Sequence, residues 1–165
     1  MTSAAVSVGA GVPDHAISLL HDIALEVFAS MIRCPLTTPP DGVSGSYARD
    51  VAGTVAFSGS WTGYVSIVTS QQAARHITAS LLEMEPSQVD GQLRDAMGEV
   101  VNMVTGSFRT RMMKPGDVST ITMPVVATGS DVTIEPPGDV GHVVRSYLMG
   151  AEVVDIHLVV TNLRR

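Results

Sequence analysis

The sequence predicts an α+β (mixed α/β) domain in which helices pack on an antiparallel sheet. In three segments apolar residues recur at helical spacing, and in most of the others β-branched residues dominate or alternate with polar ones. These segments follow one another as a helix, a hairpin, two helices and a final group of strands. The length of 165 residues and the composition, 45% hydrophobic and 16% charged, suit a single domain with its own core.

Helices are expected at three places. The first covers residues 14–33, with Asp14 as its N-cap. A short second helix covers residues 71–82. The third and longest covers residues 86–112, and Asp90 completes a capping-box pattern at its start.

Two strands of a hairpin are expected over residues 51–57 and 61–67, because small or polar residues alternate there with apolar ones. The Gly-Ser pair between them suits a tight turn. A two-residue loop would put Phe57 and Trp61 on opposite faces of the sheet, whereas a three-residue loop would put them on the same face. The residues leave both possibilities open. Later strands are expected over residues 119–127, 132–135, 142–149 and 152–161.

Charge and cysteine content exclude several classes of function. The chain has a formal net charge of -6 and no basic patch, which disfavours binding to nucleic acid or to anionic membranes. Cys34 is the only cysteine, so an intrachain disulfide is impossible and a thiolate metal cluster is not expected. The five histidines show no spacing typical of metal ligands.

The N-terminal residues 1–13 are expected to form a mobile tail before a domain of residues 14–165. Residues 4–12 are apolar, but this stretch is too short to span a membrane and no basic segment precedes it. No membrane insertion and no secretion signal are therefore expected, and the expected compartment is the cytoplasm.

The long helix separates into two faces when its residues are placed at 100° intervals. One face is apolar and predicts burial against the sheet; it consists of Leu93, Met97, Val100, Val104 and Phe108. The opposite face carries Asp95, Gly98, Glu99, Asn102, Gly106 and Arg109. Glycines at 91, 98 and 106 each cost roughly 1 kcal/mol relative to alanine inside a helix, so they need a reason.

Glu99 and Asn102 are three residues apart, so their side chains are neighbours on the outer face of this helix. Gly98 and Gly106 flank Asn102 and are expected to leave bare backbone around it, which would let another protein approach closely. A solvated helix face would explain the same polar residues, and the glycines would equally serve helix packing.

The stretch from Asp95 to Arg109 resembles the signature helix of the CheC/CheX/FliY family of chemotaxis phosphatases. Their pattern is an acidic residue or serine, glutamate four residues later, asparagine three after that, and a proline downstream, a place that Pro124 could fill. CheC-like and FliY-like members carry two such helices and CheX-like members carry one. The first helix here has Ala29 where the second asparagine would stand, so the resemblance is closest to CheX.

This resemblance implies a phosphatase that hydrolyses the aspartyl phosphate of a CheY-like response regulator. Asn102 would orient the attacking water, Glu99 would contact the partner's lysine, and Asp95, Gly98, Gly106 and Arg109 would be supporting or partner-contact residues. The receiver would supply Mg²⁺, so no cofactor or metal is expected in this chain. The resemblance also implies a homodimer. The alternative is a non-catalytic adaptor of the same fold that binds a receiver domain without turnover.

Overall fold

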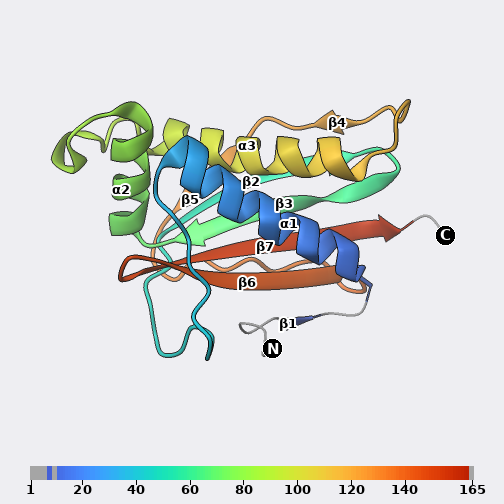
Figure 1. Ribbon diagram of the computed structural model, residues 1–165, viewed down its shortest axis with the longest axis horizontal. Helices are drawn as coiled ribbons and strands as arrows, with labels where there is room; N and C mark the ends of the chain where they lie inside the picture. The colour runs from blue at the N-terminus through green and yellow to red at the C-terminus, as the bar shows by residue number, and fades with distance from the viewer. Residues whose placement is uncertain (1–6, 9–10, 164–165) are drawn as a thin grey trace.

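The computed structural model describes residues 7–8 and 11–163. One antiparallel sheet forms the base of the domain, and helices α1 (Asp14–Val27) and α3 (Leu93–Met112) lie across one of its faces (Figure 1). Helix α2 (Gln71–Leu82) stands at one end of the sheet and contacts α3. The predicted α+β class with helices on an antiparallel sheet is therefore confirmed.

The sheet has seven strands, and its pairing places the last part of the chain in the middle. From one edge the order is β1 (Ser7–Val8), β6 (Gly141–Met149), β7 (Glu152–Leu163), β3 (Trp61–Thr69) and β2 (Val51–Ser58). Two short strands, β4 (Thr120–Ile121) and β5 (Val125–Thr128), both pair with β2 and form the other edge. This edge runs beside α3, which packs on β2.

The register of the β2–β3 hairpin decides the question that the sequence leaves open. Phe57 lies opposite Gly63, so residues 57 and 61 point to the same face. Phe57 is 2% exposed and Trp61 packs against the same core. The pairing of β3 with β7 requires a glycine at position 63, because a Cβ atom there would lie 2.0 Å from the carbonyl oxygen of Val159 on β7.

The hydrophobic core lies between the sheet and the helices and is mostly aliphatic. The predicted apolar face of α3 is buried in full: Leu93, Met97, Val100, Val104 and Phe108. Phe108 contacts Phe57 with ring centroids 5.8 Å apart, which ties the end of α3 to β2. Each such burial stabilises the fold by roughly 1.5–3 kcal/mol, so the orientation of α3 about its axis is strongly determined.

Helix boundaries differ from expectation at both of the longer helices. Asp14 is the first helical residue and Pro13 takes the cap position, so Asp14 is not the N-cap. The helix continues as a π-helical turn, Phe28–Ile32, and ends at Arg33, whose φ is 63°.

The long helix also begins later than predicted. Pro86–Gln88 form a separate 3-10 turn, and α3 starts only at Leu93. Val89 lies between the 3-10 turn and α3 and is completely buried, which fixes the chain in a turn at this residue. Asp90 pairs with Arg75 at 2.8 Å rather than capping a helix, and Gly91 lies outside α3. Only two glycines therefore stand inside the long helix.

Residues 132–135 do not form the predicted strand. They run over the sheet face opposite the helices, where the amide N–H of Val132 donates to the carbonyl of Arg49 at 2.8 Å. Val132 and Ile134 are half-buried against this face and line a hollow there. Their apolar, β-branched character serves to cover the sheet.

The structure describes part of residues 1–13, the stretch that is predicted to be a mobile tail. Ser7–Val8 pairs with Val143 and Val144 of β6, and Val12 is 7% exposed within the core. The rest of that stretch, residues 1–6 and 9–10, lies outside the described residues.

One stretch, Asp14–Ile32, is long and apolar enough by composition to cross a membrane. In the structure several of its apolar side chains, among them Ile23 and Phe28, are completely buried in the domain core. Core packing accounts for the apolar composition of this stretch.

Candidate functional site

Burial of one face of α3 presents the predicted polar face at the surface. Asp95 and Glu99 are exposed, and Asn102, Gly106 and Arg109 are partly exposed. The polar face is thus carried by a helix whose opposite side is buried along its whole length. Such a support holds functional side chains more firmly than a loop would.

Glu99 and Asn102 lie side by side in this face, because residues three apart on a helix have Cβ atoms about 5–6 Å from each other. Within the part of the chain that the structure describes, neither side chain makes a hydrogen bond to another residue. Their carboxylate and carboxamide are therefore free to bind groups of another molecule.

Gly98 does not leave the surface bare as the sequence suggests. It is buried, and a Cβ atom there would lie 3.2 Å from Cβ and 3.3 Å from Cγ of Pro124. Gly98 therefore lets the segment before β5 approach α3 closely. The proline that the family pattern suggested thus packs directly beside Glu99.

Gly106 has the environment that was expected of both glycines. A Cβ atom there would meet nothing within 4 Å, and the residue is partly exposed one turn after Asn102. Alanine would fit and would stabilise the helix by about 1 kcal/mol. Since neither packing nor a left-handed backbone requires this glycine, bare backbone beside Asn102 is the feature that remains to explain it.

Asp95 and Arg109 stand at the two ends of the polar face. Asp95 lies in the first turn of α3, where a negative charge interacts favourably with the helix dipole. Arg109 donates from Nη1 to the carbonyl of Ser119 at 3.3 Å, and its Nε is buried with no partner among the described residues. Arg109 is thus partly occupied in holding the segment that precedes β4.

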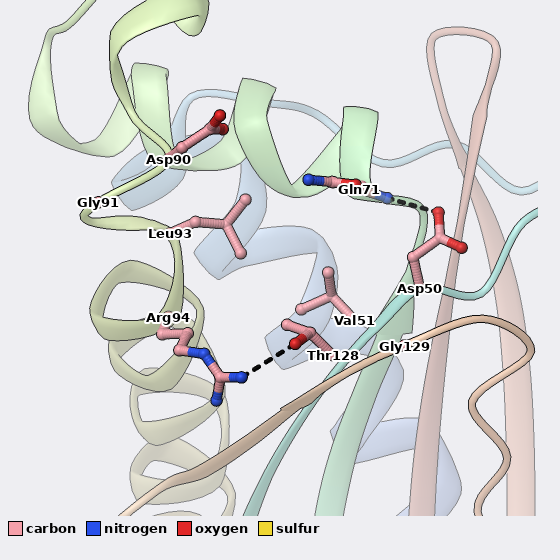
Figure 2. A pocket seen from close by; sticks show the side chains of 9 residues that line it. All are labelled: Asp50, Val51, Gln71, Asp90, Gly91, Leu93, Arg94, Thr128 and Gly129. Atoms are coloured by element: carbon pink, nitrogen blue, oxygen red, sulfur yellow. Dashed lines mark hydrogen bonds between the residues drawn. The ribbon is translucent and has the colours of Figure 1, made fainter.

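A hollow of about 460 Å³ lies at the start of α3, between α2 and the end of β5 (Figure 2). Arg94 reaches from α3 to Thr128 at 2.9 Å, and the amide N–H of Gln71 donates to Asp50 at 3.0 Å. A smaller hollow of about 300 Å³ shares Arg94 and lies directly beside Glu99. The sequence predicted neither, because both are formed where α3 meets a segment about 30 residues away.

The sheet face opposite the helices carries a buried polar cluster that the sequence also did not predict. Asp155 accepts from Arg49 Nε at 2.9 Å and from Ser146 Oγ at 2.5 Å. His142 Nε2 and His157 Nδ1 are 3.0 Å apart. Burial, with His142 as a second cause, lowers the pKa of His157 to about 4. The two histidines meet only through the β6–β7 register, which spacing along the chain does not reveal.

An antiparallel sheet with α1 and α3 across one face is the architecture that the resemblance to the CheC/CheX/FliY family implies. The family described as Chemotaxis phosphatase CheX matches residues 51–147, which hold the β2–β3 hairpin, α2 and α3. The chain belongs to this family. Comparison with curated proteins gives no match.

Solved structures share the whole fold. A CheC-like protein from Shewanella sp. PV-4 superposes with a TM-score of 0.77 at 21% identity, covering 92% of this chain and 100% of that one. The chemotaxis protein CheX from Desulfovibrio desulfuricans gives a TM-score of 0.75 at 18% identity, covering 89% and 99%. CheX in a CheX–CheY–BeF₃–Mg²⁺ complex from Borrelia burgdorferi gives a TM-score of 0.72 at 19% identity, covering 89% and 98%. At these identities the similarity shows the fold.

Proposed function

We propose that this chain hydrolyses the aspartyl phosphate of a CheY-like response regulator, using the polar face of α3. The observation that carries the proposal is the surface around Asn102. Its carboxamide has no hydrogen-bond partner among the described residues, Glu99 lies beside it, and Gly106 leaves bare backbone next to it. Membership of a phosphatase family supports assigning that surface to phosphoryl chemistry.

In the proposed mechanism Asn102 positions the attacking water. Its side-chain oxygen accepts a hydrogen bond from the water and holds the water oxygen in line with the phosphorus–oxygen bond to aspartate. The water oxygen forms a bond to phosphorus, the bond to the aspartyl oxygen breaks, and inorganic phosphate and the free carboxylate result. Such reactions depend on positioning and on charge stabilisation, and a neutral amide adds no negative charge near the phosphate.

Glu99 is assigned a docking role. Its exposed carboxylate would pair with the lysine of the receiver's phosphorylation site and so fix the register of Asn102 over the phosphate. The Mg²⁺ that neutralises the phosphoryl oxygens is assigned to the receiver. The solved CheX–CheY complex, which contains BeF₃ and Mg²⁺, supports a receiver as the partner class.

A single site in each chain is also part of the proposal. The corresponding region of the first helix ends with Ala29, which is exposed but has no polar group to hold a water. Homodimer formation remains a prediction from the resemblance, and a cytoplasmic location remains a prediction from the sequence.

The test is the decay of phosphate from receiver domains of the same organism, phosphorylated with acetyl phosphate and Mg²⁺, with and without catalytic amounts of this protein. We expect Asn102→Ala to lower turnover by about 10²–10³-fold, the scale for loss of one positioned polar group, while receiver binding persists. Glu99→Gln keeps the shape and removes the charge, so it should weaken binding. Glu135→Gln, at an exposed glutamate outside α3, is the matched control and should change neither.

If Asn102→Ala hydrolyses the phosphate at the rate of the unmodified protein, Asn102 does not position the attacking water. Stoichiometric receiver binding by the unmodified protein without any acceleration would instead support the adaptor alternative.

A further inference from the structure

The hollow of about 460 Å³ at the start of α3 is lined by one charge of each sign that has no ion-pair partner. Arg94 donates to the carbonyl of Val126 at 2.8 Å and to Thr128 Oγ1 at 2.9 Å. Both acceptors are neutral, and Arg94 forms no ion pair within the part of the chain that the structure describes. Asp50 likewise forms none there, and one of its carboxylate oxygens accepts only from the amide N–H of Gln71 at 3.0 Å. The positive and the negative charge therefore both keep hydrogen-bonding capacity for a further molecule.

The two charges stand on opposite sides of this hollow. Figure 2 shows Asp50 at one side and Arg94 at the other, with Val51 and Leu93 between them. Val51 is 1% exposed and Leu93 is 5% exposed, so these two side chains belong to the core and form a fixed floor. Because the floor separates the two charges, they cannot neutralise each other.

The backbone around Asp50 is fixed before any ligand binds. The N–H of Asp50 donates to the carbonyl of Thr69, and its own carbonyl accepts from the N–H of Gly129, each at 2.9 Å. The next residue, Val51, pairs with both β3 and β5. The guanidinium of Arg94 is held on the same strand β5 by its two hydrogen bonds. Groups that are already held in place lose little freedom when a ligand binds, which favours affinity.

Two glycines keep the rim of the hollow open. A Cβ atom at Gly91 would meet nothing within 4 Å, and one at Gly129 would meet only Val132, at 3.7 Å. Neither glycine has a positive φ, so neither the backbone nor the packing requires a glycine at these positions. Access to the hollow is the feature that remains to explain them. Asp90, the other charged residue of the lining, is paired with Arg75 at 2.8 Å.

The charges define the class of ligand. A guanidinium has five N–H groups and binds a carboxylate through two parallel hydrogen bonds, and Arg94 uses two of the five within the protein. A carboxylate such as that of Asp50 binds an ammonium group in the same charge-assisted way. The volume lies at the low end of the range of about 300–1,000 Å³ that is typical of small-molecule sites. A small molecule that carries a carboxylate and an ammonium group satisfies both sides, whereas an apolar ligand would leave both charges unpaired.

We propose that this hollow binds a free amino acid, with Arg94 contacting its carboxylate and Asp50 its ammonium group. Glu99 and Asn102 do not line the hollow, so the inference does not depend on the function proposed above. Arg94 also lines the smaller hollow beside Glu99, so the bound amino acid lies next to the surface assigned to the receiver.

The experiment titrates the full chain with each common L-amino acid up to about 10 mM and follows the NMR resonances of its amides. At least one amino acid should bind with a Kd of about 1 mM or lower, which a ligand of about ten non-hydrogen atoms can reach. Its binding should shift the resonances of Gly91 and Gly129. Propionate and ethylamine each carry only one of the two charged groups, so each should bind at least about tenfold more weakly.

Two substitutions test the contacts. Asp50→Asn keeps the shape and an acceptor for the N–H of Gln71 but removes the charge, and Arg94→Gln removes the opposite charge. Each should raise the Kd at least about tenfold. The matched controls Asp139→Asn and Arg111→Gln, at exposed residues outside the hollow, should leave the Kd unchanged. Arg94→Lys keeps the charge, so it should bind the amino acid more tightly than Arg94→Gln does.

If no amino acid shifts the resonances of the lining residues at about 10 mM, the proposal is wrong. Propionate that binds as tightly as the amino acids would overturn it too, because a simple anion would then suffice. Equal effects of the test substitutions and their controls would place the ligand elsewhere. Asn102→Ala should bind the amino acid as the unmodified protein does, so a failure of the proposed phosphatase activity and a failure of this site are measured separately.

Discussion

Replacing Gly98 or Gly106 by alanine makes the same chemical change at two positions of α3 with different surroundings. At either position alanine gains about 1 kcal/mol of helix stability. At Gly106 the new methyl group meets nothing within 4 Å, so this gain is kept in full. For a domain of this size that corresponds to an increase in Tm of about 2–4 °C.

At Gly98 the same methyl group would stand 3.2 Å from Cβ of Pro124 and 3.7 Å from Cγ2 of Val126. The ring of Pro124 is rigid, and the next residue is paired with Thr54 of β2, so relief requires a shift of β5. Overpacking of this kind costs about 1–3 kcal/mol. The net change is then between about zero and a loss of 2 kcal/mol, and the two variants should differ by about 1–3 kcal/mol.

Equilibrium unfolding in urea, with both variants and the unmodified protein at one pH, measures this difference. Adding Pro124→Ala to Gly98→Ala should recover part of the loss, which would show that the two residues interact directly. If Gly98→Ala stabilises the protein as much as Gly106→Ala does, the close contact with Pro124 is not what keeps residue 98 a glycine. For Gly106→Ala the KM for the phosphorylated receiver is measured as well. We expect this variant to be more stable but to have a raised KM, because stability and function compete at such a position.

Two further predictions concern the sheet. The pKa of His157 is lowered to about 4, so unfolding takes up a proton below pH 6.5 and stability falls between pH 6.5 and 4, by up to about 3 kcal/mol in total. The slope of the free energy of unfolding against pH should be smaller in His157→Asn than in the unmodified protein. The control His76→Asn, at an exposed histidine, should leave this slope unchanged. Equal slopes in all three proteins would contradict the assignment of the pH dependence to His157. Gly63→Ala would place Cβ 2.0 Å from the carbonyl oxygen of Val159, so a loss of about 3 kcal/mol or a failure to fold is expected. Gly129→Ala, whose Cβ would meet only Val132 at 3.7 Å, is the control, and similar stability of the two variants would refute the predicted clash.

Much of the architecture follows from short-range pattern. Helix α2 covers the predicted residues 71–82, and the buried side of α3 is the predicted one, because 3.6-residue periodicity depends only on the backbone of the helix itself. The fold class follows from the order of such segments. Glu99 and Asn102 were found in the same way, since residues three apart on a helix are neighbours whatever the rest of the chain does.

Long-range contacts decided the rest. Residues 132–135 have strand-like composition but find no strand to pair with, and they cover the sheet instead. Residues 86–92 have helical features, but burial of Val89 interrupts the helix before α3. In each case a tertiary contact overrode a local preference of about 1 kcal/mol or less.

The amino-acid sequence alone determined that this protein has a long amphipathic helix with a paired glutamate and asparagine on its outer face. The tertiary structure decided what surrounds that pair. Gly98 and Gly106 are the same residue type on the same face, yet one is covered by Pro124 and the other is open. Met123 lies beside Glu99 for the same reason. Periodicity along one helix fixes only which way its side chains point, whereas their neighbours depend on strand register and packing between segments far apart in the chain.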